Sequence, residues 1–147
     1  AQSAAAVAPA LNKVVVDTAP TTLRANYNAA YAQLRAGQFD SATEGFEQVV
    51  AQNTNDEDVA MAYFWLADLY ALQSDVERSR EVLTQLINQY PQHRKVPDAT
   101  FKLAKVYNQL SDHTKAKSLL SQLLATYKDS PIAAKALSFQ QQHYSQP

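Results

Sequence analysis

A repeat with a period of 37 residues constrains the fold of this chain more than any other feature of its sequence. Two sets of positions carry the period, with small residues at Ala30, Ala67 and Ala104 and large apolar residues at Phe46, Leu83 and Leu120. A period of about 20–50 residues is typical of chains that stack copies of one supersecondary unit. The sequence therefore predicts a stack of similar units.

Each unit is predicted to be a hairpin of two helices. Apolar residues recur at helical spacing on both sides of a break, such as the one at 72–75 in the second unit. Gly37 occupies the same place in the first unit and suits a residue just past a helix end. Only 2 Gly and 6 Pro interrupt the 147 residues, which favours helices throughout. The predicted helices span 22–36, 40–52, 57–72, 76–90, 97–110, 113–127 and 131–143.

The order of residues within a unit resembles the tetratricopeptide pattern, whose usual length is about 34 residues. The resemblance implies an all-α, right-handed solenoid of three helical hairpins with a C-terminal capping helix. We place the repeats at 23–56, 60–93 and 97–130 and the capping helix at 131–143, within a domain of residues 22–147. Residues 1–21 are rich in Ala and Pro and are predicted to form a flexible linker.

Four segments narrow the resemblance to one family: YNAAYAQLRAGQFDSATEGFEQVV (27–50), AYFWLADLYALQSD (62–75), INQYPQHRKVPDATFKLAKVY (87–107) and AKSLLSQLLATYKDSPIAAKAL (116–137). They resemble the C-terminal domain of the periplasmic Tol–Pal system coordinator family (CpoB or YbgF) over about residues 23–137. The chain departs from that family at three places. It has FWLA at 64–67 where the family has YWLG, Asn53-Thr54 where the family has its first YP, and Lys128 where the family has its last Pro.

This resemblance implies a non-catalytic adaptor in the periplasm. Its partners would be a component of the Tol machinery and a peptidoglycan synthase, so that wall synthesis is coordinated with outer-membrane constriction during cell division. The family also carries an N-terminal trimerising coiled coil, which would allow an oligomer and has no counterpart in these 147 residues. The Ala-Gln start is compatible with cleavage of a signal peptide and equally with a truncated chain.

Two other functions stay open at this stage. One is the tetratricopeptide module of an outer-membrane assembly lipoprotein, and the other is the accessory repeat domain of a cell-wall enzyme. The chain has no Cys, which weighs against an acylated lipoprotein unless the acylated residue lies outside the sequence. A coiled coil, a lipidated Cys or a catalytic domain in the adjoining gene sequence would separate the three.

The sequence lacks the motifs of several classes of function. Without Cys there is no thiolate metal site, and His93, His113 and His143 are too widely spaced for a metal-binding pair. The two glycines form no phosphate-binding loop, and no nucleophile motif is present. The sequence contains no run of 18 apolar residues, the length that spanning a membrane requires. Its net charge of −1 gives no general attraction to nucleic acid. The sequence therefore predicts protein partners, no cofactor and no catalysis.

Charge is unevenly distributed along the chain. Residues 36–89 contain ten acidic and two basic residues, whereas residues 90–147 contain eight basic and three acidic residues. Such an asymmetry can orient a charged partner during association. An unevenly charged solvated surface is the alternative explanation.

The first helix of each hairpin is expected to line a concave groove. The predicted groove residues are Arg24, Tyr27, Tyr31, Arg35, Met61, Phe64, Asp68, Phe101, Lys105 and Asn108. Among them, Tyr27, Phe64 and Phe101 recur every 37 residues, and each is followed one helical turn later by a polar or charged residue. Aromatic residues are favoured at binding hot spots, so the stripe predicts anchors for a partner segment. Alternatively, these rings only cover the neighbouring repeat.

Overall fold

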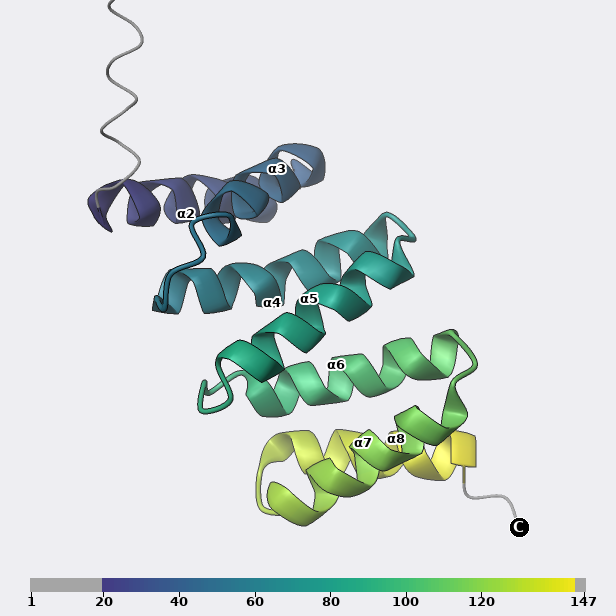
Figure 1. The fold of residues 1–147 in the computed structure, drawn as a ribbon. Helices are drawn as coiled ribbons and strands as arrows, with labels where there is room; N and C mark the ends of the chain where they lie inside the picture. The colour runs from purple at the N-terminus through teal and green to yellow at the C-terminus, as the bar shows by residue number, and fades with distance from the viewer. Residues whose placement is uncertain (1–19, 145–147) are drawn as a thin grey trace, which may run out of the picture. The chain divides into compact units, whose positions relative to one another are not determined.

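A computed structural model describes residues 20–144, and this part of the chain consists of α-helices joined by short turns (Figure 1). The helices are α2 (Pro20–Arg35), α3 (Phe39–Val50), α4 (Glu57–Leu72), α5 (Val76–Gln89), α6 (Val96–Gln109), α7 (His113–Thr126) and α8 (Pro131–Tyr144). The predicted all-α class, with three hairpins and a final helix, is confirmed, and every predicted helix end lies within two residues of the observed one. Residues 1–19, which hold most of the predicted linker, lie outside the described residues. The chain divides within α4 into two compact units, Ala1–Ala62 and Tyr63–Pro147.

The turns inside the three hairpins close in the same way. The backbone N–H groups of Gln38, Asp75 and Asp112 donate to the carbonyl oxygens of Gln33, Tyr70 and Tyr107 at 2.9, 2.8 and 2.8 Å. The residues just before these donors, Gly37, Ser74 and Ser111, have left-handed backbones with φ of 79°, 63° and 64°. This combination of a left-handed residue and a long-range backbone bond is the usual way to end a helix. The repeat therefore preserves the turn geometry even where Ser replaces Gly.

Aspartates begin the helices that follow two of these turns. The side chain of Asp75 accepts a hydrogen bond from the Arg78 N–H at 3.1 Å, and that of Asp112 accepts one from the Lys115 N–H at 3.2 Å. Each bond satisfies a backbone donor in the first turn of a helix. Asp75 therefore caps α5, whereas Ser74 is the left-handed residue of the turn.

Glycine in place of Ser74 is expected to stabilise the protein. A residue with a side chain pays for a left-handed backbone, and glycine does not, so Ser74→Gly should raise the free energy of unfolding by about 0.5–1 kcal/mol. Thermal unfolding measures the change as a rise of a few degrees in Tm. Ser118→Gly on the exposed face of α7 is the matched control and should lower Tm, because glycine weakens a helix interior. A Tm lowered by Ser74→Gly contradicts the left-handed turn.

Small side chains are buried at corresponding positions of the three hairpins. The six positions Ala30, Ala67, Ala104, Ala42, Ser79 and Ala116 are at most 2% exposed. In the second hairpin the Ser79 hydroxyl donates to the Ala67 carbonyl at 2.9 Å, which fixes how closely α5 approaches α4. In the first hairpin a Cβ on Gly45 would lie 2.8 Å from the Ala30 Cβ, so α2 and α3 meet in a space that only glycine fits.

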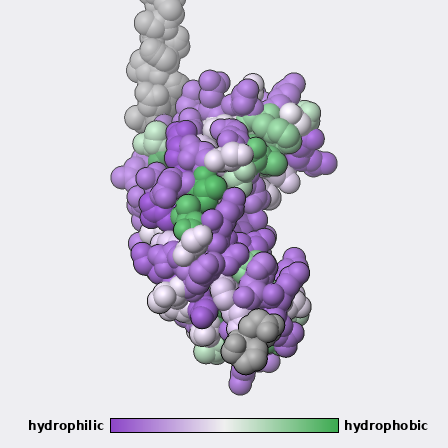
Figure 2. All heavy atoms as spheres, turned by 90° about the vertical axis from the view of Figure 1, so that its right-hand side faces the viewer, coloured by the Kyte–Doolittle hydropathy of each residue, from purple (hydrophilic) through white to green (hydrophobic). Residues whose placement is uncertain are grey.

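The final helix covers the third hairpin. Ile132 and Ala136 of α8 join a buried cluster with Phe101 of α6 and with Leu120 and Leu123 of α7. The capping role expected of this helix is therefore confirmed within the compact unit Tyr63–Pro147. Most of the face shown in Figure 2 is hydrophilic, and the exposed large apolar residues of the described chain are Phe39, Leu72 and Leu137. Among residues 20–144, no helix combines the length and the apolar character that crossing a membrane requires.

Candidate functional site

Arg24, the first predicted groove residue, is engaged by a carboxylate of its own unit. Its Nε lies 2.8 Å from Oδ2 of Asp58, whose side chain is only 5% exposed. Burial raises the pKa of Asp58 above its usual value, and the nearby Arg24 guanidinium opposes that rise. Arg24 therefore compensates a buried negative charge, whatever further role it has in binding.

The other predicted groove residues of α2 are Tyr27, Tyr31 and Arg35. The two tyrosine rings pack in series from the hairpin core to an open pocket. The Tyr27 ring meets the Phe46 ring of α3 edge to face, with centroids 5.6 Å apart, and Tyr31 stacks parallel to Tyr27 at 6.2 Å. Tyr31 and Arg35 both line a pocket of about 600 Å³ along α2. Tyr27 thus links the hairpin core to the surface, while Tyr31 and Arg35 are presented to solvent.

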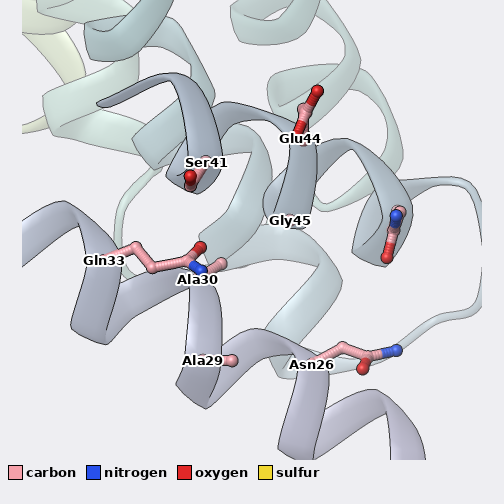
Figure 3. Close-up of a pocket in the computed structure, with 8 residues that line it drawn as sticks. Asn26, Ala29, Ala30, Gln33, Ser41, Glu44 and Gly45 are labelled. Carbon is pink, nitrogen blue, oxygen red and sulfur yellow. The ribbon is translucent and has the colours of Figure 1, made fainter. Parts of the chain in front are cut away.

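A second hollow lies between α2 and α3 and contains none of the predicted groove residues. Its volume is about 260 Å³, and Figure 3 shows the Gln33 side chain extending over Ala30 toward α3, with Ser41 and Glu44 on the opposite side. Ala30 and Gly45 form part of the lining where the two helices approach closely. The hollow therefore follows from the small residues that allow this approach.

Met61 and Phe64 of α4 are only 6% and 5% exposed. The ammonium groups of Lys95 and Lys102 lie 5.1 and 5.0 Å from the centroid of the Phe64 ring, as cation–π contacts. Lys102 Nζ also lies 2.7 Å from Oδ1 of Asp68, one helical turn after Phe64. Lys102 of the next hairpin therefore contacts both Phe64 and Asp68, and Lys95 contacts Phe64.

The α6 residues continue this pattern in the same unit. Phe101 is 8% exposed, and Lys105 Nζ lies 4.8 Å from its ring centroid. Desolvation lowers the pKa of Lys105, the nearby cations Lys102 and Lys135 lower it further, and Asp68 opposes the change. Asn108 accepts a hydrogen bond from the Tyr144 hydroxyl, which ties the end of α8 to α6.

Burial divides the predicted groove residues into two classes. Met61, Phe64 and Phe101 are buried, so they support the surface more than they form it. The other seven keep at least part of their side chains accessible: Arg24, Tyr27, Tyr31, Arg35, Asp68, Lys105 and Asn108. Helical periodicity places all ten residues on the first helix of a hairpin but does not reveal which of them the next element covers. Partner binding by these residues remains a prediction.

Two residues beside Phe101 and Lys105 were not predicted from the sequence to be functional. Lys135 and Phe139 lie on α8, and they line an open pocket of about 450 Å³ together with Phe101 and Lys105. The final helix was interpreted only as a cap. The signal available was the i, i+4 spacing of a cation and an aromatic ring on that helix, which is the spacing that places them on one face.

Comparison with known families identifies the repeat. Models described as tetratricopeptide repeat match residues 27–94 and residues 98–130. The chain carries tetratricopeptide repeats. These matches cover the three hairpins from residue 27 onward, so Arg24 and the start of α2 precede the first match, and α8 follows the second match.

Solved structures of tetratricopeptide type share the fold. PcrH from Pseudomonas aeruginosa superimposes with a TM-score of 0.68 at 21% identity, covering 82% of this chain and 89% of that chain. SycD, a type III secretion translocator chaperone of Yersinia enterocolitica, gives 0.68 at 15% identity, with coverage of 86% and 92%. PcrH in complex with the chaperone binding region of PopB gives 0.69 at 21% identity, with coverage of 82% and 95%. No curated protein matches the chain in sequence.

Proposed function

We propose that this tetratricopeptide chain is a non-catalytic protein-interaction adaptor of the periplasmic Tol–Pal coordinator type. In this role it coordinates peptidoglycan synthesis with outer-membrane constriction during cell division, in contact with a Tol-machinery component and a peptidoglycan synthase. The observation that carries the proposal is an aromatic residue followed one turn later by a charged residue on the first helices of hairpins. Tyr31 with Arg35 on α2 and Phe101 with Lys105 on α6 are two such pairs, and Phe64 with Asp68 on α4 is a third, in which Asp68 is paired with Lys102. Such pairs combine an anchor with an orienting charge.

The sequence resemblance over residues 23–137 supports the choice of the Tol–Pal family, and the tetratricopeptide repeats support interaction with proteins. Among proteins of the same fold, PcrH has been crystallised with the chaperone binding regions of PopB and PopD. In those complexes the fold holds a segment of a partner protein. We infer the same kind of ligand for this chain, taken from a component of the Tol machinery.

Replacing Tyr31 and Arg35 together by Ala is expected to weaken binding of the purified Tol-machinery periplasmic domain by at least about 2 kcal/mol. Both side chains line the pocket along α2, and neither is buried in the hairpin core. Isothermal titration calorimetry measures the change, and circular dichroism should show unchanged helix content. Phe64 is unsuited to this test because its removal would also leave a cavity in a buried site.

Phe39→Ala provides the matched control. Phe39 is an aromatic residue with 42% exposure at the start of α3, outside the predicted groove residues. Its removal should leave the affinity unchanged. Equal affinity for the parent and the Tyr31/Arg35 variant would remove α2 from the interface, and no binding by the parent would contradict the proposed partner.

A further inference from the structure

The pocket between α6 and α8 has an aromatic wall. Phe101 of α6 and Phe139 of α8 meet edge to face, with ring centroids 5.8 Å apart and an interplanar angle of 90°. Phe101 is nearly covered, whereas Phe139 keeps part of its ring accessible. Together they offer an apolar contact area inside an open pocket of about 450 Å³. Because the pocket is open to solvent, it suits one or two side chains of a bound segment better than a small molecule sealed from water.

The same pocket carries positive charge without an ion-pair partner. Lys105 and Lys135 both line it, and among the described residues neither ammonium group forms an ion pair with a carboxylate. Asp68 is the acidic side chain whose charge is felt at Lys105, and it is paired with Lys102 at 2.7 Å. The pocket therefore presents two cations without a carboxylate partner beside an aromatic wall, an arrangement complementary to an anionic ligand that also carries an apolar group.

We propose that this pocket binds an acidic segment of a partner protein. One carboxylate of the segment lies between Lys105 and Lys135, and a neighbouring apolar side chain packs on Phe101 and Phe139. Charge complementarity selects the anion, and the adjoining rings select a ligand that carries an apolar group next to its charge. An Asp or Glu beside a Leu or Phe has both properties. The inference rests on the proposed function only in taking the ligand to be a protein, and it assigns to α8 a binding role beyond capping.

Fluorescence anisotropy with two labelled peptides tests the pocket. The probe repeats the unit Asp-Leu-Glu-Phe, and its matched control repeats Asn-Leu-Gln-Phe. The acidic probe should bind the full chain with an affinity that falls as salt is raised, and the amide control should bind at least about tenfold more weakly. Equal binding of the two peptides, or no binding of either, overturns the proposal.

Charge reversal locates the binding. Lys105→Glu combined with Lys135→Glu should lower the affinity for the acidic probe at least about tenfold. Lys117→Glu combined with Lys128→Glu makes the same change in net charge at exposed positions outside the pocket and should alter the affinity less than about twofold. An equal loss in the two variants overturns the pocket as the site, because it would reflect only the general charge of the unit. Circular dichroism and Tm establish that both variants are folded.

Two further measurements distinguish a protein ligand from a lipid surface and distinguish this proposal from the proposed function. Vesicles containing anionic lipid should compete poorly with the probe, and vesicle binding that is tighter and is lost in the Lys105/Lys135 variant assigns the pocket to a lipid surface and overturns the proposal. If the probe binds as expected while the Tol-machinery domain does not, the acidic-segment pocket stands and the proposed function fails. If that domain binds the parent and the Lys105/Lys135 variant equally and the variant also keeps the probe, the pocket fails alone.

Discussion

Leucine in place of Ala67 is expected to destabilise the protein by about 1–3 kcal/mol, toward the upper end of that range. Ala67 is 1% exposed, and its carbonyl accepts the Ser79 hydroxyl at 2.9 Å, so α5 lies directly against this turn of α4. Leu adds three carbon atoms where no space exists for them. Urea unfolding followed by circular dichroism measures the loss as a lower midpoint with an unchanged slope.

Ala71→Leu is the matched control for this substitution. It lies one turn further along α4 at an exposed position next to the helix end, so the same three carbons meet solvent and should change stability by less than about 0.5 kcal/mol. If Ala67→Leu were as harmless as its control, the crossing of α4 and α5 would lie elsewhere on the helix.

Alanine in place of Gly45 is expected to lower the stability of the first hairpin. Its Cβ would stand 2.8 Å from the Ala30 Cβ and 3.4 Å from the Ala30 Cα, both of which are fixed by the α2 backbone. The clash costs about 1–3 kcal/mol and exceeds the gain of about 1 kcal/mol that Ala brings to a helix interior. A lower Tm measures the net effect, at the upper end of the range if the helices cannot move apart.

A double-mutant cycle identifies the cause. In the variant with Ala30→Gly and Gly45→Ala, the methyl group moves from one helix to the other and the contact is relieved, so most of the loss should be recovered. Gly37→Ala is a different control, because nothing lies within 4 Å of a Cβ there and only the left-handed backbone, with φ of 79°, opposes the change. Additive effects of the Ala30 and Gly45 substitutions would show that these residues do not touch.

Much of the fold follows from the sequence because the same local devices recur in every unit. The helix α4 begins and ends at the predicted residues 57 and 72, since Asp56 accepts the Asp58 N–H at 2.8 Å at its start and the turn at Ser74 closes its end. Small residues at the hairpin crossings carry the packing register from one unit to the next. A 37-residue period therefore constrains both the helix ends and the faces that pack.

The parts that sequence reasoning did not predict depend on contacts outside the period. Gly45 has no small counterpart in the other units, where Val82 and Leu119 stand, so its role in the first crossing is specific to that hairpin. A glycine inside a helix was itself a signal, since it needs a packing reason to offset its cost. Phe64 is covered by lysines of the following hairpin, which periodicity within α4 cannot reveal.

The pocket between α6 and α8 was missed for a related reason. It joins a repeat helix to the final helix, and the final helix is not a repeat of anything that precedes it. Its aromatic and basic residues therefore had no counterparts with which to align. Non-repeated elements at the end of a repeat array are thus a place where structure adds most to a sequence-based interpretation.

If the first helices of the hairpins bind a partner segment as proposed, NMR spectroscopy should map the footprint of that partner onto them. Backbone amide NMR spectra of the labelled chain would be recorded with increasing amounts of the Tol-machinery periplasmic domain. We expect the shifts to concentrate on α2, α6 and the adjoining face of α8, around Tyr31, Arg35 and Lys105. Exposed amides of α3, α5 and α7 should stay unchanged. Shifts confined to α3, α5 and α7, or no shifts at saturating partner, would contradict it.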